Sequence, residues 1–146
     1  GALSVDHIEY LVDSDIPSLV KSETVAVLLP GAFYYLSEVQ KPPVEALRAH
    51  NVPIAVATDF NPGSSPLASL LTALNMSCVL FKLTPEEALR GATEHAASAL
   101  GLNDRGVVDI GNVADLTLWD IETPAELVYC INGHRPIAVF KDGKHV

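Results

Sequence analysis

Basic residues are scarce in this 146-residue sequence. Nine lysines and arginines stand against 18 aspartates and glutamates, which gives a formal net charge of −9. A chain this acidic repels phosphate backbones and anionic lipid surfaces. Nucleic acid and an anionic membrane are therefore excluded as main partners, and a small-molecule ligand is expected.

Cysteines and long hydrophobic runs are also rare. Cys78 and Cys130 lie far apart within apolar segments and match no metal-binding spacing. They are expected to be buried thiols of a reducing compartment, and a disulfide is the less favoured alternative. No apolar run reaches the roughly 18 to 20 residues that span a bilayer, and no charged start precedes an apolar signal segment. The sequence thus predicts a soluble, cytoplasmic protein.

Hydrophobic residues, in contrast, make up 49% of the sequence, which is enough for one core of ordinary size. Short apolar segments alternate with helical ones over residues 1–104. Strands are expected at residues 2–9, 24–29 and 54–58, and helices at residues 16–21, 42–50, 67–83 and 85–100. This alternation is typical of parallel βα units with right-handed crossovers, and hence of an α/β fold.

Several helix boundaries have local signals. Residues 13–15, Asp-Ser-Asp, form an N-cap cluster before the first helix. Thr84, Pro85 and Glu87 predict a capping box with proline in the first turn. The segment 67–83 is apolar nearly all round, so it is expected to be a buried helix.

The pattern changes at two points. Pro30 and Gly31 end the second strand, and residues 32–35 are expected to be a loop. Beyond residue 104 short β segments follow, at residues 106–111, 114–120, 127–131 and 137–144. Asp142-Gly143 predicts a tight turn. We expect two regions, a βα region at residues 1–104 and a small β region at residues 105–146.

Asp59 is the leading candidate for a functional side chain. It follows the apolar run 52–58, which is typical of a strand buried on both faces, and the carboxyl ends of such strands carry active-site residues. Residues 62–66, Pro-Gly-Ser-Ser-Pro, offer N–H and hydroxyl groups before a helix expected near Leu67, an arrangement suited to an anionic group. The alternative that Asp59 and Asn61 only cap turns stays open.

Five segments together resemble the imidazolonepropionases, a family of the metal-dependent amidohydrolase superfamily. They are Ser-Val-Asp-His-Ile (4–8), Val-Leu-Leu-Pro-Gly (27–31), Ala-Thr-Asp-Phe-Asn-Pro-Gly-Ser-Ser-Pro (57–66), Leu-Thr-Pro-Glu-Glu-Ala (83–88) and Gly-Val-Val-Asp-Ile-Gly-Asn-Val-Ala-Asp-Leu (106–116). The resemblance covers essentially the whole chain. It implies the C-terminal part of a (β/α)8 TIM barrel, about strands six to eight with their helices, plus a segment of a small β-sandwich.

The resemblance also implies an activity and a set of site residues. Family members hydrolyse the ring amide of 4-imidazolone-5-propanoate to N-formimidoyl-L-glutamate in histidine degradation, with one zinc or iron ion. Asp59 is implied as a metal ligand and as the group that carries a proton to the departing ring nitrogen. His7 is implied beside the metal, within reach of the reacting carbonyl. Asn61, Gly63 and Ser64 are implied to hold the substrate, and Tyr34 and Tyr35 to line the pocket.

Other features that the family implies do not occur in this sequence. It contains no His-x-His, and a second histidine with a nearby catalytic glutamate is also missing. The other histidines are expected to be surface or packing residues: His50, His95, His134 and His145. The expectation is therefore a C-terminal portion of the enzyme, inactive by itself because a catalytic zinc generally needs three protein ligands. Open strand edges predict a homo-oligomer.

Three alternatives stay open. Another amidohydrolase, a cyclic amidase or a deaminase acting on a hydantoin-like ring or a purine, would share the strand-end aspartate. A carboxylate-bearing substrate fits the loop 61–65 better than a neutral base does. The chain could instead be a non-catalytic assembly module, although such a module does not require Asp59 and His7. An incomplete gene product would also account for the missing ligands.

Overall fold

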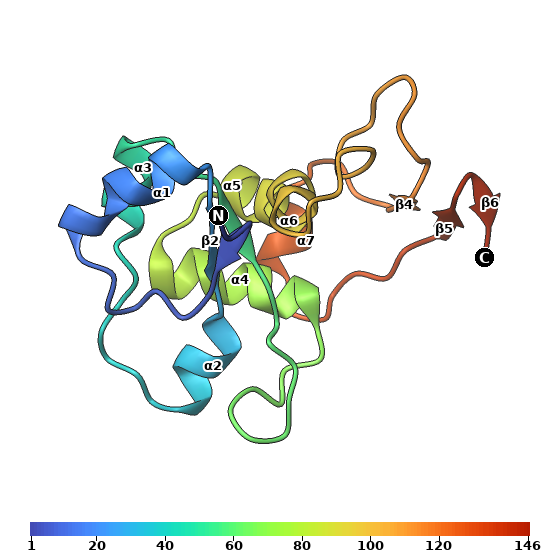
Figure 1. The fold of residues 1–146 in the computed structure, drawn as a ribbon. Coiled ribbons are helices and arrows are strands. Elements are labelled where there is room, and N and C mark those ends of the chain that lie inside the picture. The colour runs from blue at the N-terminus through green and yellow to red at the C-terminus, as the bar shows by residue number, and fades with distance from the viewer.

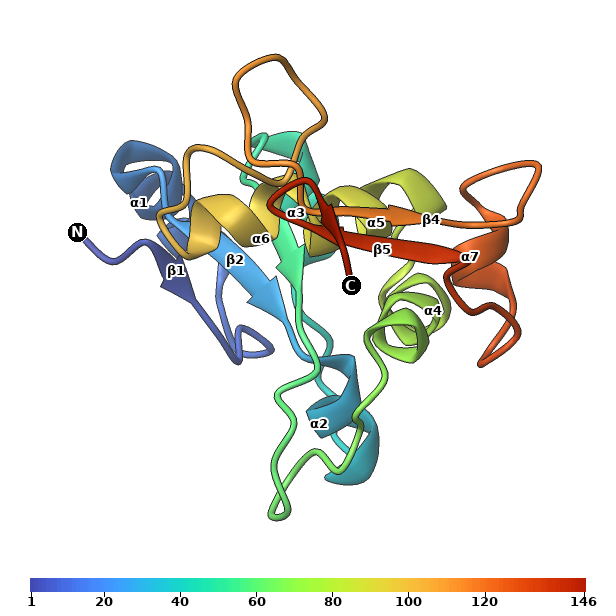
Figure 2. The same ribbon diagram turned by 90° about the vertical axis from the view of Figure 1, so that its right-hand side faces the viewer.

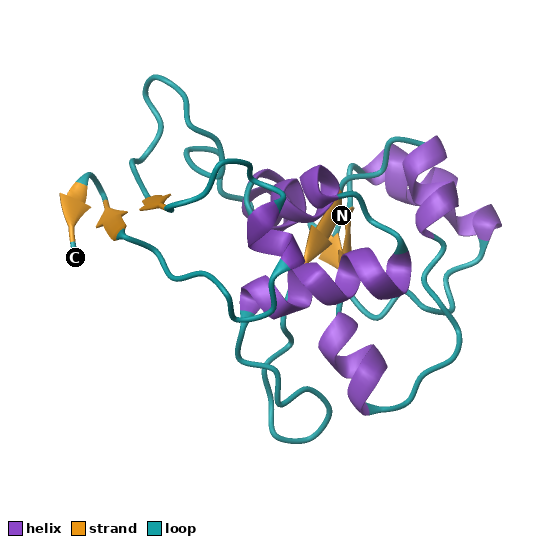
Figure 3. Cartoon of the chain, turned by 180° about the vertical axis from the view of Figure 1, so that it is seen from behind, coloured by secondary structure: helices purple, strands orange, loops and turns teal.

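The computed structural model describes residues 1–146, and the chain has an α/β fold (Figures 1 and 3). In chain order the elements are β1 (Ser4–Val5), the 3-10 helix η1 (Asp13–Asp15), α1 (Ile16–Ser22), β2 (Val25–Leu28), α2 (Pro30–Tyr35), α3 (Val44–Ala49), β3 (Ile54–Val56), α4 (Leu70–Phe81), α5 (Pro85–Ala92), α6 (Glu94–Ala99), β4 (Leu116–Leu118), α7 (Glu126–Tyr129), β5 (Ala138–Lys141) and β6 (Lys144–His145). No helix is both long and apolar enough to cross a membrane.

The first three strands form a parallel sheet in the order β1-β2-β3. Every residue of β2 and β3 is buried. Ala26 and Leu28 belong to the main core cluster, whereas Val25 and Val27 belong to a second cluster. Because successive strand residues point to opposite faces, both faces of the sheet are covered. This explains the continuous apolar runs and confirms the prediction of buried strands.

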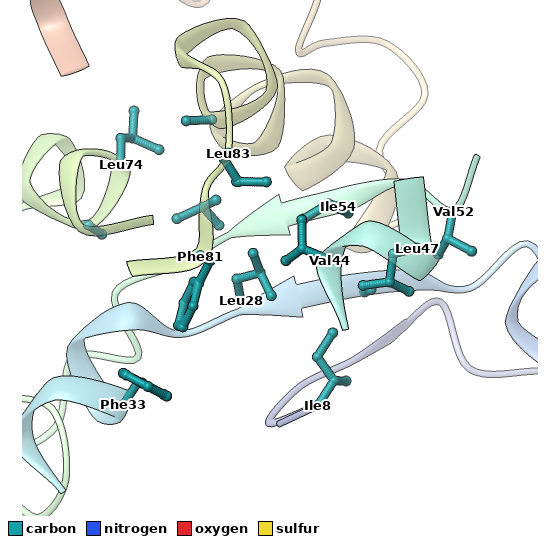
Figure 4. Packing of buried hydrophobic residues seen from close by; sticks show 14 of the residues in the cluster. Ile8, Leu28, Phe33, Val44, Leu47, Val52, Ile54, Leu74, Phe81 and Leu83 are labelled. Carbon is teal, nitrogen blue, oxygen red and sulfur yellow. The ribbon is translucent and has the colours of Figure 1, made fainter. Parts of the chain in front are cut away.

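The main core lies between the sheet and the surrounding helices (Figure 4). Val44 and Leu47 of α3 are fully covered and pack with Leu28 and other residues of that cluster. Phe33 of α2 meets Phe81 of α4 edge to face, with ring centroids 5.0 Å apart. Edge-to-face pairs of this kind add about 0.5 to 1.5 kcal/mol beyond area burial. The pair joins α2 to α4 at the end of the sheet where the strands finish.

Helices α5 and α6 contact the outer edge of β3. A Cβ atom at Gly91 would lie 3.0 Å from the carbonyl oxygen of Ile54 and 3.3 Å from the backbone nitrogen of Val56. On α6, Nδ1 of His95 lies 2.9 Å from the same Ile54 oxygen. Gly91 therefore lets α5 approach β3 closely. The His95 imidazole contacts the Ile54 carbonyl, which faces away from the neighbouring strand β2.

The last three strands form a separate antiparallel sheet in the order β4-β5-β6, to one side of the main body (Figures 1 and 2). Asp142 and Gly143 both have positive φ, 51° and 71°, as a two-residue type I′ turn requires, so the predicted tight turn is confirmed. Asp115 ties this sheet together, because its carboxylate accepts from the Asp142 N–H and pairs with Arg105 and Lys141. Residues 126–129 instead return to the main body and pack on α4 and α5.

Four expectations about secondary structure are wrong. Residues 30–35 form α2, because proline suits a first helical turn and Phe33 is buried there. Residues 127–131 are not a strand: α7 buries Leu127 and Val128, so packing overrides the β propensity of the segment. Residues 106–111 form no strand. The helix expected over residues 85–100 breaks at Thr93, whose hydroxyl bonds the carbonyl of Leu89.

Three finer expectations also need correction. The 13–15 cluster forms η1 and its side chains cap nothing, although α1 follows as predicted. Helix α4 is not buried all round, since Leu70 and Val79 are exposed. Cys130 is exposed, whereas Cys78 is partly buried, and both thiols are free. The capping box is confirmed in full, with the Thr84 hydroxyl accepting from the Glu87 N–H and the Glu87 carboxylate accepting from the Thr84 N–H.

Candidate functional site

The candidate site lies at the carboxyl edge of the parallel sheet. His7 follows β1 by two residues and Asp59 follows β3 by three. Parallel strands all end at the same edge, so the sheet brings together two residues that are far apart in the sequence. Nε2 of His7 lies 3.8 Å from Oδ2 of Asp59, across the end of β2. The two side chains that the resemblance implied at the site therefore lie side by side at the strand ends.

Both residues have a left-handed backbone, with φ of 53° at His7 and 50° at Asp59. Such a conformation costs a non-glycine residue on the order of 1 to 3 kcal/mol and clusters at functional sites. No donor in the chain hydrogen-bonds the Asp59 carboxylate, and its side chain is 29% exposed, against 55% for His7. The carboxylate and the imidazole are therefore both open to a ligand.

The loop after β3 is organised by Asn61. Its Oδ1 atom accepts from the N–H groups of Gly63 and Ser64, at 2.9 and 2.8 Å, and from the Ser64 hydroxyl. Its Nδ2 atom donates to the backbone oxygen of Asp59 at 2.6 Å. Asn61 therefore does cap the turn, as one of the open alternatives held. The Asp59 side chain, in contrast, caps nothing.

This geometry limits how the loop could bind an anion. The Gly63 and Ser64 N–H groups that were expected to face a ligand are engaged by Asn61. The helix expected near Leu67 begins at Leu70, where the Ser69 hydroxyl accepts from the Thr72 N–H. The helix start is therefore three residues further along the chain than expected and has its own cap.

The residues present do not by themselves make a metal site. No group of three histidine, cysteine, aspartate or glutamate side chains lies close enough together to hold an ion. Asp59 and His7 could supply two ligands at most, and a catalytic zinc generally needs three from the protein. The other histidines lie away from this pair, and His95 bonds the Ile54 carbonyl instead.

Two predicted pocket residues lie elsewhere. Tyr34 and Tyr35 line an apolar pocket of about 420 Å³ between α2 and α4, together with Gly31 and Met76. Neither Asp59 nor His7 lines this pocket. Ser65, whose hydroxyl was expected with the rest of residues 62–66 to suit an anionic group, is instead fully buried and donates to the Thr58 oxygen at 2.6 Å. As the second of two adjacent serines, it carries no sequence signal that separates it from Ser64.

Comparison with known proteins identifies the family. The model of the Amidohydrolase family matches residues 3–146. The chain belongs to this family. It is 62% identical to the imidazolonepropionase of Pseudoalteromonas atlantica over 144 residues, 99% of this chain and 35% of that protein. It is 57% identical to the imidazolonepropionase of Vibrio campbellii over 147 residues, 100% of this chain and 35% of that protein. The resemblance to imidazolonepropionases is confirmed.

Solved amidohydrolase structures share the fold. An adenosine deaminase from Xanthomonas campestris, solved with bound zinc, superposes with a TM-score of 0.87 at 24% identity and covers 97% of this chain and 36% of that one. The guanine deaminase of E. coli superposes with a TM-score of 0.79 at 19% identity, covering 98% of this chain and 38% of that one. The chain spans about 35% of the length of the curated relatives it matches.

Proposed function

We propose that residues 1–146 form the part of an imidazolonepropionase active site that contains Asp59. The complete enzyme hydrolyses the ring amide of 4-imidazolone-5-propanoate to N-formimidoyl-L-glutamate. The observation that carries the proposal is the Asp59–His7 pair, 3.8 Å apart at the carboxyl edge of the sheet, in a chain that is 62% identical to such an enzyme. In this proposal the sheet is the part of a (β/α)8 barrel that holds strands six to eight. Residues 105–146 are then part of a small β-sandwich.

The chemistry assigned to this chain is proton transfer and orientation. Hydrolysis of the ring amide requires a base that takes a proton from the attacking water and an acid that gives one to the departing nitrogen. The Asp59 carboxylate accepts no hydrogen bond and is partly exposed, so it is available for both transfers. His7 lies within reach of the same carboxylate and would donate a hydrogen bond to the reacting carbonyl. Asn61, Gly63 and Ser64 are proposed to border the substrate.

A divalent ion, zinc or iron, is proposed as cofactor of the assembled enzyme, with Asp59 as one of its ligands. In amidohydrolysis such an ion makes hydroxide available near neutral pH. The remaining ligands are not among residues 1–146, where no cluster of three ligating side chains occurs. The chain by itself is therefore proposed to be inactive toward imidazolone propionate.

A deaminase is the second candidate, because the solved adenosine and guanine deaminases share the fold. The loop 61–65 and the matches at 55 to 62% identity to imidazolonepropionases favour the first. A chimera decides between them, with residues 1–146 replacing the matching segment of the P. atlantica enzyme. We expect the zinc- or iron-loaded chimera to consume imidazolone propionate and to leave adenosine and guanine unchanged, measured by ultraviolet absorbance. A folded chimera with no imidazolone propionate hydrolysis would contradict the proposal.

A further inference from the structure

Two of the sequence segments that define the family resemblance meet in space. Gly31, at the end of Val-Leu-Leu-Pro-Gly, lies in α2, and Ser65 lies in the loop after β3. Both views of the ribbon show this loop passing beside α2, below the ends of the strands (Figures 1 and 2). A Cβ atom at Gly31 would lie 2.5 Å from Oγ of Ser65 and 2.9 Å from Cδ2 of Leu67. Only glycine leaves room for the serine hydroxyl at this contact.

Ser65 closes the loop onto the strand end. Its side chain is fully buried, and its hydroxyl donates to the Thr58 oxygen at 2.6 Å. The N–H of Asn61 donates to the Ser65 oxygen at 3.0 Å, so Ser65 is joined to Thr58 before Asp59 and to Asn61 two residues after it. No other side-chain hydroxyl hydrogen-bonds the Thr58 carbonyl.

These contacts hold both peptide groups that flank the Cα atom of Asp59. The Ser65 hydroxyl donates to the Thr58 carbonyl, and the side-chain amide of Asn61 donates to the Asp59 carbonyl. The left-handed φ of 50° at Asp59 is unfavourable for a non-glycine residue and persists only where the surroundings fix it. The backbone conformation sets the direction of the Cα–Cβ bond of Asp59, and in this conformation Oδ2 lies 3.8 Å from Nε2 of His7.

We propose that Ser65 is a positioning residue that fixes the Asp59 carboxylate beside His7, and that Gly31 is required because it makes room for the Ser65 hydroxyl. The proposal deepens the proposed function, since positioning matters only if Asp59 acts in the reaction. Its structural part, that Ser65 determines the backbone of Asp59, can be tested without any activity.

The structural test is NMR spectroscopy of the full 146-residue chain. A positive φ brings the amide proton and the Hα of one residue unusually close, so Asp59 should give a strong intraresidue cross-peak. We expect the cross-peak to weaken to that of an ordinary residue in Ser65→Ala. Ser69→Ala is the matched control, because it removes the N-cap hydroxyl of α4 without touching the loop. An Asp59 cross-peak of unchanged strength in Ser65→Ala would overturn the proposal.

Gly31→Ala is the second variant, and it stays informative if Ser65→Ala fails to fold. Alanine favours helix formation relative to glycine, yet its Cβ displaces the Ser65 hydroxyl. We expect Gly31→Ala to lose the same Asp59 cross-peak. An Asp59 cross-peak of unchanged strength in Gly31→Ala would contradict the proposal that Gly31 makes room for the Ser65 hydroxyl.

The kinetic test uses the P. atlantica chimera that carries residues 1–146. Displacing a reacting group by about 1 Å costs roughly 100-fold in rate. We expect Ser65→Ala to lower kcat by about 10- to 100-fold and to leave KM within about twofold, because the substrate-bordering groups of Asn61 and Gly63 remain, whereas Ser69→Ala should change neither. Loss of the cross-peak with unchanged kcat would overturn the positioning role. An inactive unsubstituted chimera would instead contradict the proposed function and leave the structural result standing.

Discussion

His7 and Asp59 both have a left-handed backbone conformation. This conformation allows the contribution of each residue to stability to be distinguished from its contribution to the proposed reaction. A φ near +50° is uncommon for non-glycine residues, although asparagine, aspartate and histidine adopt it more often than most, asparagine and aspartate most readily. If Asp59 and His7 act in the proposed reaction, this backbone conformation serves the placement of their side chains rather than stability.

The first prediction concerns His7→Asn. We expect the free energy of unfolding of the chain to stay level or to rise by up to about 1 kcal/mol, because the strain is relieved. The same substitution in the chimera should lower kcat about 100-fold, because the hydrogen bond to the reacting carbonyl is lost. Urea denaturation and steady-state kinetics give the two values. A destabilised chain with normal kcat would mean that His7 is structural.

At this scale the sequence could predict part of the arrangement at the sheet edge. The place of Asp59 at the sheet edge could be predicted from the continuous apolar run before it, whereas His7 was singled out only by the family resemblance. The sequence did not predict that the Asn61 side chain accepts hydrogen bonds from the Gly63 and Ser64 N–H groups. Whether a backbone donor faces a ligand or a neighbouring side chain depends on loop dihedrals, which composition leaves open.

At the scale of elements, helix α5 packs closely on strand β3. The second prediction concerns Gly91→Ala. A new Cβ 3.0 Å from the Ile54 oxygen and 3.1 Å from a Val56 methyl group must push the helix from the strand. Overpacking of this kind costs about 1 to 3 kcal/mol, which outweighs the roughly 1 kcal/mol that alanine gains over glycine in a helix. Thermal denaturation should show a lower Tm, with the exposed Ser98→Ala in α6 as control. An increased Tm would contradict the close packing.

The third prediction concerns the ion pair between α3 and α5. The Arg48 guanidinium donates two hydrogen bonds to Glu87, at 2.7 and 2.9 Å, and so lowers the pKa of that carboxyl group. Because the folded pKa is lowered, the stabilisation is complete above the ordinary glutamate pKa of about 4.3 and is lost as pH falls through the lower folded value.

Glu87→Gln isolates this ion pair, since glutamine at that position still completes a capping box. Because solvent screens this partly exposed ion pair, we expect Glu87→Gln to lower the free energy of unfolding by only about 1 kcal/mol at pH 7. The difference from the unsubstituted chain should shrink as pH falls below about 4.3. Urea denaturation as a function of pH measures it, and a difference that is constant from pH 7 to pH 3 would contradict the role of the charge.

Elements were predictable where the local signal and the packing agree. Strands β2 and β3, the Thr84 capping box and the Asp142-Gly143 turn each have a local cause, and each is present. Helices α2 and α7 were missed because each is short and is held by tertiary contacts. Phe33 packs on Phe81 in the first, and in the second Asn75 of α4 donates to the carbonyls of Val128 and Tyr129.

At the scale of the whole molecule, several large apolar side chains are exposed. Phe60, Tyr34 and Leu36 are exposed near the carboxyl edge of the sheet, and Val108 and Ile110 in the region beyond residue 104. Apolar side chains that gather on one surface can form an association site.

The fourth prediction is that the purified 146-residue chain self-associates and does not hydrolyse imidazolone propionate, even with added zinc or iron. Light scattering should give a mass above the 15.5 kDa of one chain. A monodisperse monomer would argue against association through these surfaces. Turnover at an enzyme-like rate would show that residues 1–146 hold a complete site.

The proposed activity depends on one carboxylate, that of Asp59, three residues beyond the end of β3. In the chimera that carries residues 1–146, Asp59→Asn keeps the size of the side chain and removes its basicity, and Asp120→Asn on the exposed surface is the matched control. The deciding measurement is kcat for imidazolone propionate. We predict a fall of at least about 1,000-fold for Asp59→Asn and no change for Asp120→Asn, whereas a kcat within about threefold of the parent in Asp59→Asn would contradict the role of Asp59.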